Sequence, residues 1–254
     1  VSNSIIPILL TISGSLIQVY LPLFSKLYEN RDFNSLKRIL FIIEKYSSIV
    51  FLSIIIIVFL NSELMIGLFL PNFTQSIPIL KIMIFIPFFQ GTTLPYAYLF
   101  ISGKKQSVIA YINTFHRILI IFLMIILTPS TLFILPMFNL GGLGFAIAQT
   151  IPWILWSLLC HYFTYKYFKI RKQKAILFNV VLAFITFFLM MFVQNILMIL
   201  IVNKLVVLLI STFIAIGMYL GLLFTSKQLD KNDIKFFAEI LKIKKYLTSL
   251  KEEL

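Results

Sequence analysis

Residues 143–163 read LGFAIAQTIPWILWSLLCHYF, and residues 164–174 continue as TYKYFKIRKQK. The first piece has no Asp, Glu, Lys or Arg, and it is about as long as the roughly 20 residues that a helix needs to cross the hydrocarbon core of a bilayer. The second piece carries five Lys and Arg residues directly after that run. An apolar helix that ends in a cationic cluster is typical of a membrane span whose basic end stays in the cytoplasm.

Six further apolar runs each have one end close to a cluster of Lys and Arg residues. All but three of the 22 Lys and Arg residues lie in the first, third and fifth gaps between runs or in the C-terminal tail. By the positive-inside rule these gaps are cytoplasmic. We therefore expect a multi-pass protein of the cell membrane with a cytoplasmic C-terminus and with Val1 outside. The seven runs cover roughly residues 5–24, 46–60, 77–101, 108–127, 143–163, 176–193 and 205–225.

The composition excludes the main alternative classes of protein. Apolar residues make up 60% of the 254 residues, whereas a soluble domain has about 45–50%. A membrane β-barrel alternates apolar and polar residues along its strands, and these runs do not. The net charge of +13 comes mostly from residues beside the spans, so we expect contact with the lipid bilayer and no binding of nucleic acid.

The predicted fold is an all-α, polytopic membrane helix bundle with seven transmembrane helices and a C-terminal amphipathic helix. Residues 1–227 form the transmembrane bundle in this interpretation, and residues 228–254 form a cytoplasmic tail helix. The tail repeats apolar residues at alternating spacings of four and three, which fits a helix on the inner leaflet or a short coiled coil. The first span runs from outside to inside, so a cytoplasmic N-terminus of the native protein would require an odd number of spans before Val1. The chain is then the C-terminal half of a larger protein.

Local patterns predict how the spans begin, bend and pack. The second helix is expected to begin near Asn34, as an amphipathic lead-in with Glu44 at the membrane interface. Pro87 and Pro95 predict a bend in the third helix. Small residues four apart, Gly144 and Ala148 among them, predict a close approach of two helix backbones in the fifth. Few polar residues interrupt the sixth and seventh spans, so these are expected at the periphery, with the first, third, fourth and fifth at the centre.

Acidic residues are absent from the interiors of the seven apolar runs. No carboxylate relay for protons or sodium is therefore expected in this half. The chain also lacks paired carboxylates, metal-spaced His or Cys clusters, and a nucleophile beside a base. We expect a protein that is not an enzyme and that has no catalytic residues, no metal site and no cofactor.

The candidate substrate-binding residues are Arg117, Asn113, His116 and Gln18. Arg117 lies near the middle of the fourth span, where a cation costs about 2.5–3.5 kcal/mol on insertion scales. Asn113 shares its helix face, and His116 lies at the edge of that face. Gln18 belongs to a polar stripe on the first span. Arg117 must face either an anionic substrate or a carboxylate outside the chain.

The order of these features resembles the C-terminal half of a polysaccharide biosynthesis flippase of the multidrug, oligosaccharidyl-lipid and polysaccharide exporter superfamily. The resemblance rests on residues 21–27 before the first basic loop, 68–73 after the second span, 101–105 (ISGKK), and 139–148 at the start of the fifth span. It implies two helix bundles that rock about a central cavity and move a lipid-linked oligosaccharide across the membrane. It implies no ATP site and no catalytic residue, and it makes an N-terminal bundle the expected partner.

The resulting hypothesis is a flippase for a polyprenyl-pyrophosphate-linked oligosaccharide, with Arg117 as the cationic contact to the diphosphate. One alternative is a cation-coupled multidrug exporter of the same fold, which the absence of an acid within the runs disfavours. A second is a membrane glycosyltransferase or polymerase, which should carry a large loop with acidic residues outside the membrane.

Overall fold

The computed structural model describes residues 17–132, 135–171 and 173–229, which form an all-α helix bundle. Within these residues, six helical segments are long and apolar enough to cross a membrane. The predicted polytopic helix bundle is therefore confirmed, and the chain is a multi-pass membrane protein. Only the end of the first predicted span is described, and the predicted tail helix lies almost entirely beyond residue 229, outside the described residues.

The helices begin close to the starts of the apolar runs, except in the second span, and α7 and α8 run five and seven residues past the ends of theirs. In the second span the helix begins at Phe33, beside the predicted Asn34, but it continues nine residues past Leu60. The elements in chain order are α2 (Ile17–Glu29), α3 (Phe33–Phe69), the 3-10 helix η1 (Pro71–Ser76), α4 (Ile77–Met83), α5 (Ile86–Ser102), α6 (Gln106–Leu127), β1 (Thr131–Leu132), β2 (Leu135–Pro136), α7 (Gly141–Phe168), α8 (Lys174–Leu200) and α9 (Lys204–Thr225).

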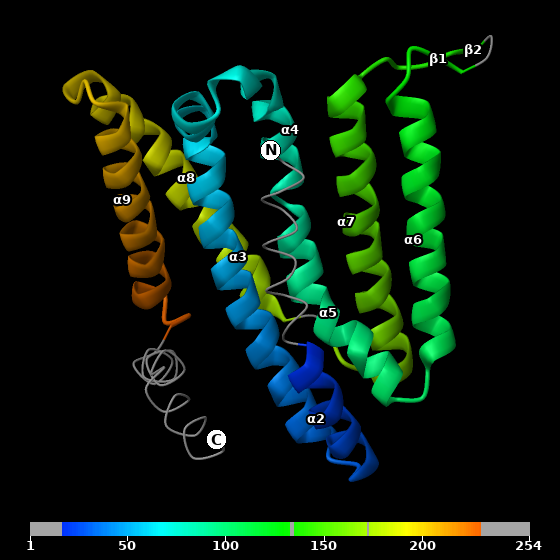
Figure 1. The fold of residues 1–254 in the computed structure, drawn as a ribbon. Coiled ribbons are helices and arrows are strands. Elements are labelled where there is room, and N and C mark those ends of the chain that lie inside the picture. Colours follow the sequence, from blue (N-terminus) through cyan, green and yellow to red (C-terminus); the bar gives the residue numbers. More distant parts are fainter. Residues whose placement is uncertain (1–16, 133–134, 172, 230–254) are drawn as a thin grey trace, which may run out of the picture.

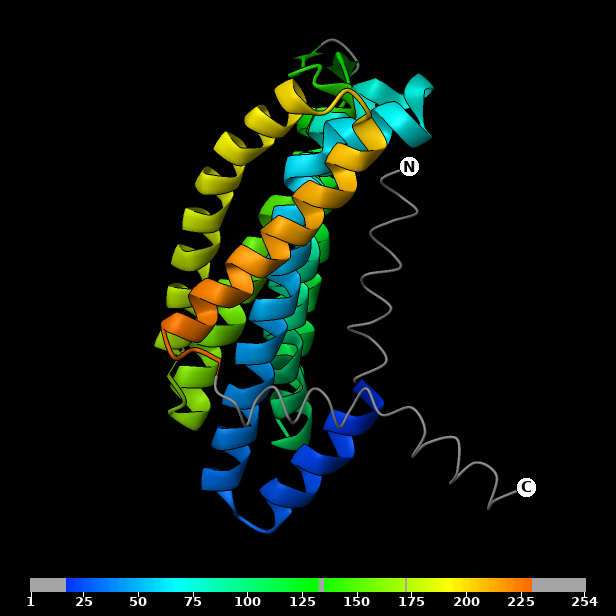
Figure 2. The same ribbon diagram turned by 90° about the vertical axis from the view of Figure 1, so that its left-hand side faces the viewer.

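The basic gaps all lie at one end of the bundle. Figure 1 shows the α2–α3, α5–α6 and α7–α8 turns and the end of α9 at the bottom, and Figure 2 shows α2 and α3 forming a V at this end. We call it the basic end. Each helix that finishes there is followed by a cationic residue with φ near +55°, namely Arg31, Lys104, Lys169 and Lys227. Cations are favourable at helix C-termini because they offset the negative end of the helix dipole.

The long helix α3 is the centre of the bundle. It packs against α5 on one side and against α8 and α9 on the other. In its most apolar stretch 56% of the residues are buried, against 22% in α6 and in α9. α6 packs mainly on α7 at the edge of the described bundle. The expectation of a central fourth span is thus wrong for the described bundle, and the second span, α3, takes that place.

The predicted bend in the third span falls at Ile84 and Phe85, between α4 and α5. Pro87 lies in the first turn of α5, where a residue needs no N–H donor because the first backbone N–H groups of a helix are unpaired in any case. Pro95 stays inside α5 and is buried. The two prolines therefore act differently, and Pro87 marks the break.

The close approach predicted from the small residues is present between α6 and α7. A Cβ placed on Gly144 would lie 2.3 Å from the carbonyl oxygen of Leu127, at the end of α6. Ala146 and Ala148 are fully buried in the same stretch of α7. Glycine at position 144 thus lets the two backbones touch, which holds α6 against α7.

Candidate functional site

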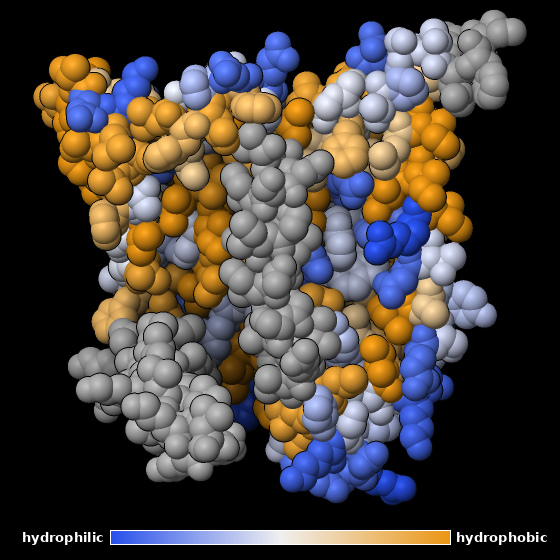
Figure 3. All heavy atoms as spheres, viewed as in Figure 1, coloured by the Kyte–Doolittle hydropathy of each residue, from blue (hydrophilic) through white to orange (hydrophobic). Residues whose placement is uncertain are grey.

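Arg117 lies at the middle of α6, about 17 Å along a helix of 22 residues. Its side chain is exposed on the face of the described bundle. Among the described residues the ion pairs are Lys81 with Glu63 and His161 with Glu44, so no described carboxylate neutralises Arg117. Figure 3 shows hydrophilic residues between the two ends of the molecule on the α6–α7 side, within a surface that is mostly hydrophobic.

The exposed side of α6 is divided into two stripes. Ala110, Asn113, Thr114 and Arg117 form a polar or small-residue stripe, and all four are exposed. Tyr111, Phe115, Ile118 and Phe122 form an apolar stripe beside it, with exposed fractions between 49% and 77%. An apolar stripe of this kind suits contact with lipid tails, whereas the polar stripe suits water, a ligand or another protein surface.

Asn113 and His116 hold α6 to two tryptophans of α7. The indole N–H of Trp156 donates to the Asn113 Oδ1 at 2.8 Å. His116 is buried, and its ring lies edge-on to Trp153 with 4.6 Å between the ring centroids. The side chain of His116 therefore lies in the interface between α6 and α7, away from the exposed stripe that carries Arg117. Asn113 stays on that stripe with its carbonyl oxygen occupied.

Gln18 lies in α2, which packs against α5 and α3. Its side chain lies outside the part of the molecule whose side chains are described. A contact between Gln18 and the Arg117 stripe stays a prediction. Of the four candidates, Arg117 and Asn113 share an exposed stripe. His116 is buried in the interface between α6 and α7.

A carboxylate that the sequence analysis placed at the membrane interface is buried within the bundle. Glu44 of α3 has an exposed fraction of 0%. The hydroxyl of Tyr96 on α5 donates a hydrogen bond to its Oε2. The Nε2 of His161 on α7 lies 3.7 Å from its Oε1. Glu44 therefore joins three helices, and its burial within the bundle is a feature that the sequence analysis did not predict.

The apolar run could not reveal Glu44 because the residue precedes that run by two positions. The helical periodicity of the lead-in does contain the signal. Leu36 and Leu40 are buried on α3, and Glu44 follows them at successive spacings of four, on the same helix face. A residue on that face turns toward the core whatever its charge, and a buried acid then needs partners.

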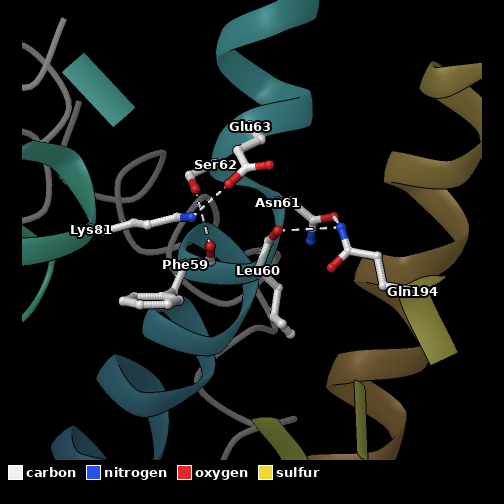
Figure 4. Close-up of polar contacts among 7 residues, drawn as sticks. All are labelled: Phe59, Leu60, Asn61, Ser62, Glu63, Lys81 and Gln194. Carbon is white, nitrogen blue, oxygen red and sulfur yellow. Dashed lines mark hydrogen bonds and ion pairs between the residues drawn. The ribbon is translucent and has the colours of Figure 1, made fainter. Parts of the chain in front are cut away.

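A second set of polar residues missed by the sequence analysis ties α8 and α9 to α3. The amide nitrogen of Gln194 donates to the Leu60 carbonyl at 3.2 Å, as Figure 4 shows. The hydroxyl of Ser211 on α9 donates to the Asn61 Oδ1 at 2.7 Å. Two residues past Asn61, Glu63 forms an ion pair of 2.8 Å with Lys81 of α4, and Glu63 is well exposed. These contacts fix the helices and leave the periphery of α8 and α9 apolar.

An apolar crevice opens between α3, α5 and α8, and its volume is about 310 Å³. Its walls offer no polar side chain to a ligand headgroup, so only hydrocarbon suits it. In the described ranges, no three His, Cys, Asp or Glu side chains are grouped so that they could hold a metal ion. The lining residues are Leu52, Ile55, Ile56, Phe59, Phe85, Phe88, Phe89, Val180, Ala183, Phe184 and Phe187.

Comparison of the chain with protein-family models, curated proteins and solved structures finds no match.

Proposed function

We propose that this bundle is half of a flippase that moves a polyprenyl-pyrophosphate-linked oligosaccharide across the cell membrane for polysaccharide biosynthesis. The observation that carries the proposal is Arg117, which is exposed at the middle of a membrane helix with no described carboxylate beside it. In this proposal the basic end of the bundle lies in the cytoplasm. A second helix bundle faces the polar stripe of α6. The proposed function includes no catalytic step and no cofactor.

The cost of an intramembrane cation explains why a cavity is expected there. A guanidinium in contact with hydrocarbon is unfavourable, so it requires water, an anion or a protein partner. The polar stripe that carries Arg117 continues over Asn113 and Thr114, which suits a wet surface. In a cavity shielded from bulk water, attraction between a cation and a diphosphate is stronger than in free solution. The planar guanidinium also pairs with two phosphate oxygens at once.

The transport test compares variants of Arg117 in the native protein that contains this chain. Arg117→Ala should abolish transfer of the glycan lipid and leave membrane insertion and abundance unchanged. Arg117→Lys should retain part of the activity, because it keeps the charge and loses the two-pronged hydrogen bonding. Tyr111→Ala is the matched control, because Tyr111 is exposed on the apolar stripe of the same helix.

The two outcomes that count against the proposal are distinct. Normal transfer by Arg117→Ala would refute a role of this residue in binding the substrate. Loss of protein from the membrane, with normal transfer per remaining molecule, would instead indicate an ion pair with a carboxylate outside the described residues.

A cation-coupled multidrug exporter of the same fold is the second candidate. The burial of Glu44 favours it, because such a protein needs an acid within its bundle and Glu44 supplies one two residues before the second apolar run. Reconstituted vesicles distinguish the two candidates. The flippase should transfer a short-chain polyprenyl diphosphate glycan, whereas the exporter should accumulate cationic drugs and leave the glycan lipid untouched.

A further inference from the structure

Two lysines share one aromatic ring at the basic end, and we propose that they bind the phosphate of an anionic phospholipid in the leaflet that borders this end. The ammonium nitrogens of Lys105 and Lys166 lie 5.5 and 5.8 Å from the centroid of the Tyr167 ring. Both distances are within the roughly 6 Å over which an aromatic face attracts a cation. The inference holds for either proposed substrate, because these residues lie at the ends of α6 and α7 and Arg117 lies at the middle of α6.

The contact between the α5–α6 turn and the end of α7 brings the two lysines together. Lys105 directly precedes α6, and Lys166 and Tyr167 lie in the last turn of α7. A Cβ placed on Gly103 in the α5–α6 turn would lie 2.7 Å from the ring of Phe168, the last residue of α7. The turn and the helix end therefore touch, and this packing sets the two cations beside the same ring.

The charge around this ring is positive. The sequence has no Asp or Glu between Glu63 and Asp230, so the helices α5 to α9 contain no carboxylate side chain. Within the described part of the chain, the ion pairs involve neither Lys105 nor Lys166. The positive end of the α6 dipole lies beside Lys105 and adds to the same potential. Two ammonium groups on one ring repel each other, and an anion held between them would turn that repulsion into attraction.

The position of the ring along α7 fits the headgroup region of a bilayer. Tyr162, Tyr165 and Tyr167 are all exposed in the last two turns of α7, and exposed tyrosines are enriched where membrane helices meet the headgroups. Lys105 and Lys166 are exposed as well, so a lipid can reach both of them. Basic pockets between membrane helices are known to bind anionic headgroups.

The charges at the site favour phosphatidylglycerol over phosphatidylcholine. The phosphatidylglycerol headgroup brings one negative phosphate and no cation. The choline headgroup brings an ammonium group of its own, which the two lysines would repel. The acyl chains of the bound lipid would then lie along the exposed apolar residues of α6, Tyr111 and Phe115 among them.

The experiment measures which lipid lies beside the site in vesicles that contain the full chain. A Ser107→Cys variant in a Cys160→Ala background carries a fluorescent label in the first turn of α6, at an exposed position two residues past Lys105. Lipids with a nitroxide quench this label when they lie next to it. Nitroxide phosphatidylglycerol should bind there about 25-fold more tightly than nitroxide phosphatidylcholine, because each nearby cation strengthens the attraction about fivefold. Equal quenching by the two lipids would overturn the proposal.

Two double variants with the same loss of charge separate a site from the general charge of the basic end. Lys105→Gln combined with Lys166→Gln should remove the preference for phosphatidylglycerol at the Ser107 label. Lys37→Gln combined with Arg38→Gln should leave it unchanged, because these two exposed cations belong to the first turns of α3 at the same end. An equal loss of preference in both double variants would show that no site exists at the Tyr167 ring.

A competition measurement tests the other source of a phosphate, the proposed transported lipid. A short-chain polyprenyl diphosphate should relieve the quenching at the Ser107 label no more than the same amount of unlabelled phosphatidylglycerol does. Stronger relief by the diphosphate would assign Lys105 and Lys166 to the transported lipid and would contradict the phospholipid site. This outcome is distinct from failure of the transport proposal, which is read from Arg117→Ala.

Discussion

Replacing Gly144 with alanine should push α6 away from α7. The added Cβ would lie 2.3 Å from the Leu127 carbonyl oxygen and 2.6 Å from its carbonyl carbon. These are backbone atoms, so a change of rotamer cannot relieve the overlap and the helices must separate. Separation would also stretch the backbone hydrogen bond from Leu140 N to Leu127 O, which is 3.0 Å long.

The expected cost of Gly144→Ala is about 1–3 kcal/mol for overpacking, with about 1 kcal/mol more if the hydrogen bond breaks. Gly217→Ala on α9 is the matched control, because nothing lies within 4 Å of the added Cβ there. It should cost nothing and can gain about 0.4–1 kcal/mol.

The assay is reversible denaturant titration of the reconstituted chain, with both variants measured beside wild type. Gly144→Ala should unfold at lower denaturant than wild type, and Gly217→Ala should not. Equal stability of the two variants would refute the conclusion that the α6–α7 backbone contact requires glycine.

Three further predictions concern the start of α3, its contact with α9, and the orientation of the chain in the membrane. Hydrogen bonds from the side chain and the backbone N–H of Ser35 lower the pKa of Asp32, the N-cap of α3. The cap is therefore complete above the ordinary Asp pKa of about 3.9 and is lost as the pH falls through the lower, folded value. Asp32→Ala should speed amide exchange in the first turn of α3 at neutral pH but not in strong acid; equal rates at neutral pH would contradict the cap. Asn61→Leu should cost about 0.6–2 kcal/mol in the same denaturant titration, because it removes the oxygen that accepts from α9; an unchanged midpoint would count against this tether. In a Cys160→Ala background, a Gln173→Cys variant should react only with thiol reagents that reach the cytoplasm. Labelling of this cysteine from outside the cell would contradict the proposed orientation.

The sequence predicts the helices well because hydrophobic length and loop charge are local properties. Each described span begins within two residues of its apolar run except α3, whose amphipathic start was predicted separately near Asn34. The extension of α3 past Leu60 was missed, because Asn61 and Ser62 read as the end of an apolar run. Both are buried, and Asn61 has a partner on α9. That partner is 150 residues away in the chain, and a local pattern cannot supply it.

The candidate site was predicted in part for the same reason. The depth of Arg117 follows from its position along α6, and its exposure is a property of the helix face. The burial of His116 depends on Trp153, which belongs to another helix. The cluster around Glu44 depends on helices α5 and α7, and only the spacing from Leu40 indicated that this acid turns inward.

The most direct test of the proposed function is the affinity of the native protein for a short-chain polyprenyl diphosphate, compared between wild type and Arg117→Ala. Hydrogen bonds to charged groups contribute about 1.5–3 kcal/mol, so the variant should bind about 10- to 150-fold more weakly. The corresponding neutral polyprenol should bind both proteins equally, because it lacks the diphosphate. Equal affinity of the two proteins for the diphosphate would contradict the proposal that Arg117 attracts an anionic lipid substrate.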